Sequence, residues 1–381
     1  MKILIAPDSF KESLGAAEVA TALARGIATV LSDAEFDLLP MADGGEGTVE
    51  AIVRARGGQY HWVSVTGPMG ERINARYGIL DDGRTAVVEM ASASGLGLVP
   101  PATRDPTKTT SYGTGEIVRH IIEQRVETII LGIGGSATVD GGAGLCQALG
   151  VQFTDRTGHT LCHPISGGQL TTITTLDRSA VPQQLGRTRL RIACDVDNPL
   201  LGARGAAAVF GPQKGASASE IATLETGLSS FYDLAERALG IRVRDRPGAG
   251  AGGGAGAALC AFFGAELESG VAIMADALRL ADRIRQADVV ITGEGNLDAQ
   301  TLFGKAPHGI ASLARQYSVP VIAVGGSITA AAEPALSRLF DAMEACVTAP
   351  GPLATALCES QHNLERAGAR IGHWLALCKR L

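Results

Sequence analysis

Several features that define common protein classes are scarce in this sequence of 381 residues. Its apolar runs stay well short of the ~18–20 residues that cross a bilayer, and residues 1–4 lead directly into an expected strand without a signal-peptide layout. The seven cysteines are scattered, odd in number and form no CxxC pair, which disfavours a disulfide framework and a structural zinc site. We therefore expect a cytoplasmic protein, without membrane contact, whose cysteines are reduced core residues.

Positive charge and aromatic side chains are also in short supply. The formal net charge of −6 argues against nucleic acid as a partner, because binding to the phosphate backbone needs a basic surface. Only six residues are lysine, and four of them lie in or beside polar loops that contain Gly, Ser or Pro: Lys11, Lys108, Lys214 and Lys305. A lysine kept at such a loop is a candidate for a point-charge contact to phosphate.

Glycine, by contrast, is abundant, with 49 residues that include a recurring loop motif. Residues 128–144, TIILGIGGSATVDGGAG, read as a buried strand, a glycine loop and the start of a helix. Such a loop directs backbone N–H groups toward a bound anion, most often phosphate, although a tight turn without a ligand is an equal alternative. The motif is echoed in residues 43–47, 253–256 and 325–329.

The chain is long for a single hydrophobic core and suits two domains. Its first ~70 and last ~90 residues alternate strands, loops and helices, whereas the middle contains antiparallel segments with an Asp-Asp-Gly turn at 81–83. We therefore predict a discontinuous domain, residues 1–75 plus 287–381, into which a second domain, residues 76–286, is inserted.

Six aspartates follow predicted strands or lie in glycine turns: Asp8, Asp43, Asp140, Asp195, Asp197 and Asp298. Any one of them is more simply explained as a helix cap or turn residue. Together they suit phosphoryl transfer, because Mg²⁺ prefers one or two carboxylates plus phosphate oxygens and the attacking hydroxyl needs a proton acceptor. Asp195 and Asp197 are the first choice for metal ligand or base.

Other catalytic patterns are absent from the sequence or weak. There is no GxxxxGK[ST] phosphate loop, no GxSxG nucleophile elbow and no HExxH zinc motif. Residues 248–253 match the GxGxxG dinucleotide fingerprint but do not follow a predicted strand. An NAD-dependent oxidoreductase and a non-catalytic sensor of sugar acids therefore remain as alternatives, and both explain fewer of the aspartates.

Taken together, a series of blocks resembles the type I glycerate kinases of bacteria, in the same order and over essentially the whole chain. They are APDSFKESL at 6–14, MADGGEGT at 41–48, EMASASGL at 89–96, RDPTKTTSYGTGE at 104–116, GIGGSATVDGGAG at 132–144, ACDVDNPLLG at 193–202, FGPQKGAS at 210–217, PGAGAGGGAGAAL at 247–259 and TGEGNLDAQTLFGKAP at 292–307. The chain differs from the family at Asn296, commonly Arg, and at Gly325, commonly Ala.

The resemblance implies an α/β fold of two domains, one Rossmann-like and built from both chain ends, the other inserted and flavodoxin-like or mixed, with the active site in the cleft between them. It also implies ATP- and Mg²⁺-dependent phosphorylation of D-glycerate, most simply at the 2-hydroxyl to give 2-phosphoglycerate; a 3-phosphoglycerate-forming kinase is the alternative. The expected partners are these small molecules, and a homodimer is a further candidate.

The hypothesis assigns roles to individual residues. Asp195, Lys11 and Asp8 are the catalytic candidates, and Asp197 and Asp298 are the metal ligands. Substrate or phosphate binding is expected of Ser9, Asp43, Gly44, Gly45, Glu46, Gly134, Gly135, Ser136, Thr138, Asp140, Asn198, Gln213, Lys214, Gly253, Glu294 and Lys305. The sequence leaves open which loop holds ATP and which holds glycerate.

Overall fold

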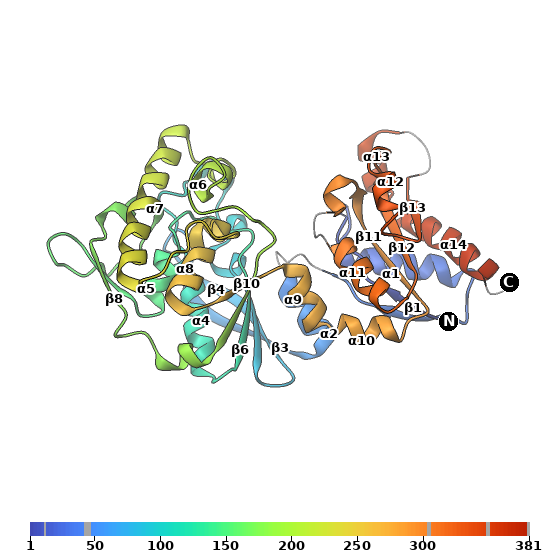
Figure 1. Cartoon of the computed structure of the whole chain (residues 1–381), viewed down its shortest axis with the longest axis horizontal. Coiled ribbons are helices and arrows are strands. Elements are labelled where there is room, and N and C mark those ends of the chain that lie inside the picture. Colours follow the sequence, from blue (N-terminus) through green and yellow to red (C-terminus); the bar gives the residue numbers. More distant parts are fainter. Residues whose placement is uncertain (11–12, 42–46, 303–305, 348–350, 379–381) are drawn as a thin grey trace. The chain divides into compact units, whose positions relative to one another are not determined.

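The computed structural model describes residues 1–10, 13–41, 47–302, 306–347 and 351–378. The chain divides into two compact units, one formed by residues 1–43 together with 274–381 and the other by residues 44–273 (Figure 1). The predicted boundary at 75/76 falls inside a strand, Arg72–Leu80, which pairs along its whole length with the strand before it. Residues 44–75 therefore group with the inserted unit.

The described part of the first unit contains a five-stranded parallel sheet in the order β13-β12-β11-β1-β2. The strands are β1 (Lys2–Ile5), β2 (Glu35–Leu38), β11 (Val289–Leu297), β12 (Val321–Ile328) and β13 (Ala342–Ala345). Counted along the chain, this order is 2-1-3-4-5, the flavodoxin-like form of the doubly wound fold. A parallel α/β sheet with strands from both chain ends is thus observed, but its strand order is flavodoxin-like where the resemblance implies a Rossmann-like domain.

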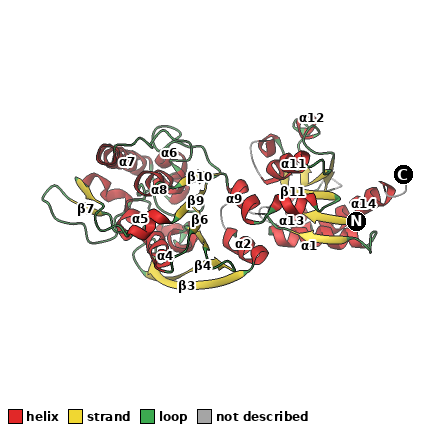
Figure 2. Cartoon of the chain, turned by 60° about the horizontal axis from the view of Figure 1, so that its bottom comes forward, coloured by secondary structure: helices red, strands yellow, loops and turns green. Residues whose placement is uncertain are grey.

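Helices cover both faces of this sheet (Figure 2). Alternate apolar residues of the strands pack against α1 (Ala16–Ala28) and α14 (Ser360–Cys378), which approach closely because Gly26 and Gly368 face the backbone of the opposite helix. On the other face lies α11 (Ala306–Gln316), whose apolar side chains are buried. The remaining helices in the described part of this unit are α10 (Leu280–Arg285), α12 (Glu333–Leu336) and α13 (Leu353–Cys358), and α9 (Gly270–Ala277) crosses the boundary between the units at 273/274.

The inserted unit is built on a six-stranded mixed sheet in the order β10-β9-β6-β5-β4-β3. The first four in this order are parallel and the last two are antiparallel, as the Asp-Asp-Gly turn predicts. The strands are β3 (Gly58–Thr66), β4 (Arg72–Leu80), β5 (Thr85–Glu89), β6 (Thr128–Gly132), β9 (Arg189–Ala193) and β10 (Glu266–Glu268); β7 (Gln152–Thr154) and β8 (Thr175–Asp177) form a separate hairpin.

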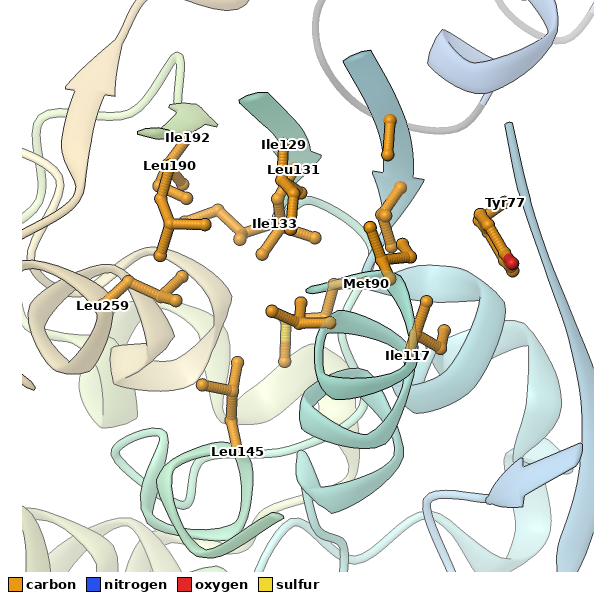
Figure 3. Packing of buried hydrophobic residues seen from close by; sticks show 14 of the residues in the cluster. Tyr77, Met90, Ile117, Ile129, Leu131, Ile133, Leu145, Leu190, Ile192 and Leu259 are labelled. Atoms are coloured by element: carbon orange, nitrogen blue, oxygen red, sulfur yellow. The ribbon is translucent and has the colours of Figure 1, made fainter. Parts of the chain in front are cut away.

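Two hydrophobic cores stabilise the inserted unit. One lies between the sheet and α4 (Tyr112–Glu123) and α8 (Ala255–Phe263), where Leu131, Ile192 and Leu259 meet (Figure 3). The second core packs α5 (Ala143–Ala148) and α7 (Ala218–Leu239) around Phe231. The other helices are α2 (Thr48–Arg56), α3 (Ala91–Ser94) and α6 (Ala206–Phe210). The β6 loop is thereby held between the sheet and a helical layer.

The cysteines are less uniformly buried than predicted. Cys146, Cys260 and Cys346 are buried, but Cys162, Cys358 and Cys378 are exposed, so the prediction that all seven are core residues is wrong. The three exposed cysteines lie in a loop or near helix ends, where no core packing is available. No helix in the described ranges is long and apolar enough to cross a membrane.

Candidate active site

In the first unit, two predicted site residues lie on the neighbouring strands β1 and β11 or just after them. The strand order of the sheet reverses its direction between these two strands. Asp8 follows β1, and Glu294 lies in the neighbouring strand β11. The Asp8 N–H donates to the Gly293 carbonyl (2.8 Å), and the Ser9 N–H donates to Asp8 Oδ1 (2.6 Å). Open α/β sheets bind ligands outside the carboxyl ends of their strands at such a switch point. Asp8, Ser9 and Glu294 therefore lie where this fold binds its ligands.

A threonine joins Glu294 to Asp298 in the same place. Thr301 donates through Oγ1 to Glu294 Oε1 (2.6 Å) and accepts through Oγ1 from the Asp298 N–H (3.0 Å). Thr301 and Glu294 are buried, so this contact fixes the carboxylate away from bulk water. Sequence reasoning missed Thr301, although its position three residues after Asp298 is typical of a turn that an Asp or Thr side chain closes.

Asn296, which differs from the family's usual Arg, supports the Asp298 carboxylate. Its Nδ2 donates to Asp298 Oδ2 (2.9 Å), the Gln300 N–H donates to Asp298 Oδ1 (2.7 Å), and Asn296 Oδ1 accepts from Ser327 Oγ (2.7 Å). The second glycine echo, at 325–329, thus contributes Ser327 to this hydrogen-bonded set. Asn296 acts here as a neutral positioning group rather than as a cation.

In the inserted unit, a buried lysine side chain forms hydrogen bonds to the glycine loop after β6. Lys214 is only 3% exposed, and its Nζ donates to Ser136 Oγ (2.8 Å) and to the Thr138 carbonyl (2.7 Å). Thr138 Oγ1 in turn donates to the Thr109 carbonyl (2.9 Å). Gly134 and Gly135 remain exposed at the rim of the loop, where their backbone could face a ligand.

Asp140 ends this loop and is fully buried. Its carboxylate accepts hydrogen bonds from Ser111, through both the N–H (2.7 Å) and Oγ (2.7 Å), and from the Gly142 N–H (3.1 Å). Ser111 was not predicted as a site residue; its place directly before helix α4 was the available signal. These bonds make Asp140 a residue that shapes the loop, with no exposed surface for direct contact with a substrate.

Burial perturbs both charged groups of this cluster. Desolvation lowers the pKa of Lys214 from 10.5 to about 7, although the nearby Asp140 charge acts in the opposite direction. Desolvation also raises the pKa of Asp140, and the hydrogen bonds from Ser111 and Gly142 oppose this shift. A lysine that titrates near neutral pH beside a buried carboxylate is the kind of perturbed pair that marks functional sites.

The loop after β9 carries three further candidates. Asp195 is exposed, and its Oδ1 accepts from the Gly270 N–H (2.9 Å). Asp197 accepts two hydrogen bonds from the guanidinium of Arg204 (2.9 Å each), and Asn198 Nδ2 donates to the Arg204 carbonyl (2.8 Å). Arg204 was missed by sequence reasoning because it lies seven residues downstream in an irregular loop.

The structure groups the remaining predicted residues as follows. Gly253 lies against the β6 loop, since the Gly141 N–H donates to its carbonyl (3.0 Å), whereas Gln213 is exposed beside the buried Lys214. Lys108 is exposed and pairs with Asp105 (2.9 Å). Lys11, Asp43, Gly44, Gly45, Glu46 and Lys305 lie outside the described residues. Within the described residues, no group of three His, Cys, Asp or Glu side chains could hold a metal ion.

The dinucleotide fingerprint at 248–253 lacks the required context. The fully described segment before it, residues 240–247, forms turns rather than a strand. The fingerprint needs a strand that leads into the glycine turn and a helix that follows. The one sequence feature that favoured an oxidoreductase therefore has a different local structure.

Comparison with known proteins identifies the family. A model described as "Glycerate kinase family" matches residues 3–376. The chain belongs to the glycerate kinase family. Glycerate 2-kinase of Escherichia coli (strain K12) is 47% identical over 377 residues, which cover 99% of this chain and 98% of that protein. Glycerate kinase of Bacillus subtilis (strain 168) is 46% identical over 379 residues, 100% of this chain and 99% of that one.

A solved structure from the same family supports the fold. A crystal structure from Salmonella typhimurium LT2, described as a glycerate kinase 2, is 48% identical and superposes with a TM-score of 0.89 over 100% of both chains. The predicted α/β fold class is thereby confirmed.

Proposed function

We propose that this protein transfers the γ-phosphate of ATP to D-glycerate, at the 2-hydroxyl, and releases 2-phosphoglycerate and ADP. The observation that carries the proposal is the full-length match, at 47% identity, to a relative named glycerate 2-kinase. The site geometry is consistent with it: two sets of carboxylates and a glycine loop lie at the carboxyl ends of parallel strands, where α/β folds bind phosphorylated ligands.

In this proposal Asp195 accepts the proton of the attacking glycerate hydroxyl. Asp195 is an exposed carboxylate at the end of β9 with one oxygen held by the Gly270 N–H, so it can be oriented and still reach a substrate. The transferring phosphoryl group gains negative charge on its oxygens, and backbone N–H groups of Gly134 and Gly135 can stabilise that charge. Lys11 and Asp8 complete the proposed catalytic set, and Lys305 is a proposed phosphate-binding residue.

Mg²⁺, when bound, would neutralise the charge of the ATP phosphates. Of the two proposed ligands, Asp298 fits better: it accepts two hydrogen bonds, from Asn296 and the Gln300 N–H, and a carboxylate has room for further ligands. Asp197 instead pairs with the guanidinium of Arg204, whose positive charge would repel a metal ion bound beside it, whereas the partners of Asp298 are neutral. Mg²⁺ takes only one or two protein carboxylates, so a compact cluster of ligands is not required.

The proposal is tested by a coupled assay of ADP release with glycerate, hydroxypyruvate and tartronate as acceptors. We expect ADP release with glycerate that depends on Mg²⁺, and ³¹P and ¹H NMR of the product should place the phosphate on carbon 2. A phosphate on carbon 3 would overturn the proposed position of transfer. The absence of ADP release with all three acceptors would overturn the kinase assignment.

The base is tested by Asp195→Asn, which keeps the shape of the side chain and removes its proton-accepting charge. We expect kcat to fall more than about tenfold, a change of ~1.4 kcal/mol in the activation free energy. Asp177→Asn serves as the control, because Asp177 is an exposed aspartate on β8 that hydrogen-bonds only locally, to Ser179. Retention of kcat within tenfold in Asp195→Asn would show that another group accepts the proton.

A further inference from the structure

Three consecutive backbone N–H groups of the loop after β6 have no acceptor in the part of the chain that the structure describes. They belong to Gly134, Gly135 and Ser136. Ser136 is held by a bridge to Gly95 on the neighbouring segment, and Gly135 has a left-handed backbone, with a φ of +67°. Successive N–H groups in such a turn converge on one side and form a concavity that binds anions. Because Gly134 and Gly135 are exposed, an anion can reach these groups.

On the buried side of the same loop, the Lys214 side chain meets two acceptors among the described residues. Its Nζ donates to Ser136 Oγ (2.8 Å) and to the Thr138 carbonyl (2.7 Å), and the residue is 3% exposed. An ammonium group has three N–H donors, and a buried charge is costly unless it is paired and fully hydrogen-bonded. These surroundings therefore favour the neutral amine, which has only two N–H donors, over the ammonium ion.

The charged group that favours the ammonium form of Lys214 is the buried Asp140, whose carboxylate already accepts hydrogen bonds from Ser111 and Gly142. The other charged side chains on the segments packed around Lys214 have partners of their own: Arg104 the Val99 carbonyl, Asp105 the Lys108 ammonium, Glu220 the Ser217 hydroxyl and Glu225 the Gly202 N–H. Desolvation lowers the pKa of Lys214 to about 7 although the Asp140 charge opposes this shift, so the amine is mostly neutral at pH 8.

We propose that a phosphate group bound at residues 134–136 draws a proton from solvent onto Lys214, so that the loop binds its anion and a proton together. The chemical step is a protonation alone: the –NH₂ group takes up H⁺ from water or buffer and becomes –NH₃⁺, which compensates the charge of the anion. The inference rests on the proposed function in one respect, that this loop receives a phosphate group of ATP or of the product.

Ser136 connects the buried amine to the anion. Its Oγ accepts from Lys214 Nζ, and no acceptor for its own hydrogen lies within the described ranges. That hydrogen can be donated to a phosphate oxygen beside the Gly135 N–H, so the ammonium charge strengthens the donor that the ligand meets. Lys214 is thus a positioning residue, which acts on the anion through Ser136 and needs no contact of its own.

Isothermal titration calorimetry of the full chain counts the protons. MgATP and 2-phosphoglycerate are titrated at pH 8 in two buffers of different ionisation enthalpy, and the difference in heat, corrected for the titration of the ligand itself, gives the protons taken up. We expect an uptake of about half a proton or more per chain with the ligand whose phosphate occupies the loop. The uptake should fall toward zero at pH 6, where Lys214 is already protonated. Uptake with one ligand alone supports the proposal and identifies the ligand that the loop receives.

Lys214→Met is the test variant, and Lys2→Met is its control. Lys214→Met should remove the uptake, whereas Lys2→Met, on β1 of the other unit, should take up as many protons as the wild type. Ser136→Ala keeps Lys214 and removes the connecting hydroxyl, so it should lower the uptake and weaken binding at least about tenfold. If Lys214→Met does not fold, the wild-type pH series and Ser136→Ala still decide the question.

Wild-type binding of both ligands without proton uptake, or an uptake that persists in Lys214→Met, would overturn the proposal. The kinase assignment would then still be decided by ADP release, because the binding experiment needs no turnover. Proton uptake without any ADP release would contradict the kinase assignment and support the anion site. Failure of both ligands to bind would overturn the two proposals together.

Discussion

At the scale of single residues, Lys214 is the most informative side chain of the candidate site. As a loop lysine in a chain that otherwise uses Arg, it suggests a phosphate contact, yet its Nζ is buried and donates to Ser136 and the Thr138 carbonyl. In this conformation the ammonium group supports the glycine loop from inside the protein. The sequence predicts that Lys214 matters to the site, but its contacts join residues 76 and 78 positions apart, which no local pattern encodes.

Lys214 should make stability depend on pH. Its pKa is about 7 in the folded chain, against an ordinary value of 10.5, so the unfolded chain binds more protons between these values and stability rises as the pH increases from about 7. Between pH 7 and 9 the wild type should therefore gain about 1 kcal/mol or more relative to Lys214→Met, which cannot titrate. Urea unfolding of both proteins at a series of pH values measures this difference. Parallel pH profiles would mean that Lys214 does not titrate in this range.

Gly253 shows how the element before α8 fixes the β6 loop. Its φ is +68°, and a Cβ at this position would overlap the Thr138 carbonyl oxygen. Gly264, after α8, has nearly the same φ of +66° but open space around it. Substitutions at Gly264 and Gly253 therefore separate two free-energy costs: that of a left-handed backbone alone, and that of the additional close approach to the Thr138 carbonyl.

We expect Gly264→Ala to lower the free energy of unfolding by about 1–2 kcal/mol, the cost of a left-handed conformation for a residue with a Cβ. Gly253→Ala should cost about 1–3 kcal/mol more, because the loop or the helix must move to admit the methyl group. Urea unfolding at one pH compares the two variants. Equal losses would show that the loop adjusts without strain.

Two ion pairs connect β9 to β10 at consecutive outward positions, and they differ in burial. Arg191 and Glu268 are joined by two hydrogen bonds (2.7 and 2.6 Å), with side-chain exposures of 11% and 24%. Arg189 and Glu266 form a similar contact, but their side chains are 58% and 55% exposed. This makes the exposed pair a control for the buried one in the same two strands.

Arg191→Met should destabilise the protein by about 2–4 kcal/mol, because it removes a largely buried guanidinium that makes two hydrogen bonds to the Glu268 carboxylate. Arg189→Met should cost less than about 1 kcal/mol, since water and salt already screen that pair. Thermal and urea unfolding measure both. A small effect of Arg191→Met would indicate that water reaches Glu268 once the guanidinium is removed.

The elements also show what the sequence could and could not predict. The strand, loop and helix rhythm at both chain ends predicts that the two ends form one domain, and their strands pair in one sheet. The turn at 81–83 predicts an antiparallel pair, which β4 and β5 form. The pairing of β5 with β6, whose residues lie about forty positions apart in the chain, is a long-range choice that joins this hairpin to the sheet of the inserted unit. Ser111 was missed because Asp140, 29 positions away, becomes its neighbour only through folding. Thr301 and Arg204 contact residues within seven positions, but in irregular segments where no helical or strand spacing identifies the partner.

At the scale of the whole molecule, the two units differ in the number of chain segments that form them. The inserted unit is one continuous segment with its own two cores, whereas the first unit needs both chain ends. We therefore expect a fragment of residues 47–273 to fold and unfold cooperatively by circular dichroism. A fragment of residues 1–41 should lack stable structure, because α1 packs on α14 and β1 pairs with β11. An inserted fragment without a cooperative transition would contradict the independence of the inserted unit.

The position of β1 has a further consequence during synthesis of the chain. β1 is complete at residue 5, but its central neighbour β11 begins at residue 289. At a translation rate of about 5–20 residues per second, roughly 15–60 s separate the two. The inserted unit can finish folding on the ribosome in that interval. During the same time the apolar residues Ile3, Leu4 and Ile5 lack β11, the strand with which they pair in the folded protein. The sheet that contains β1 is thus completed only after the whole inserted unit has been synthesised.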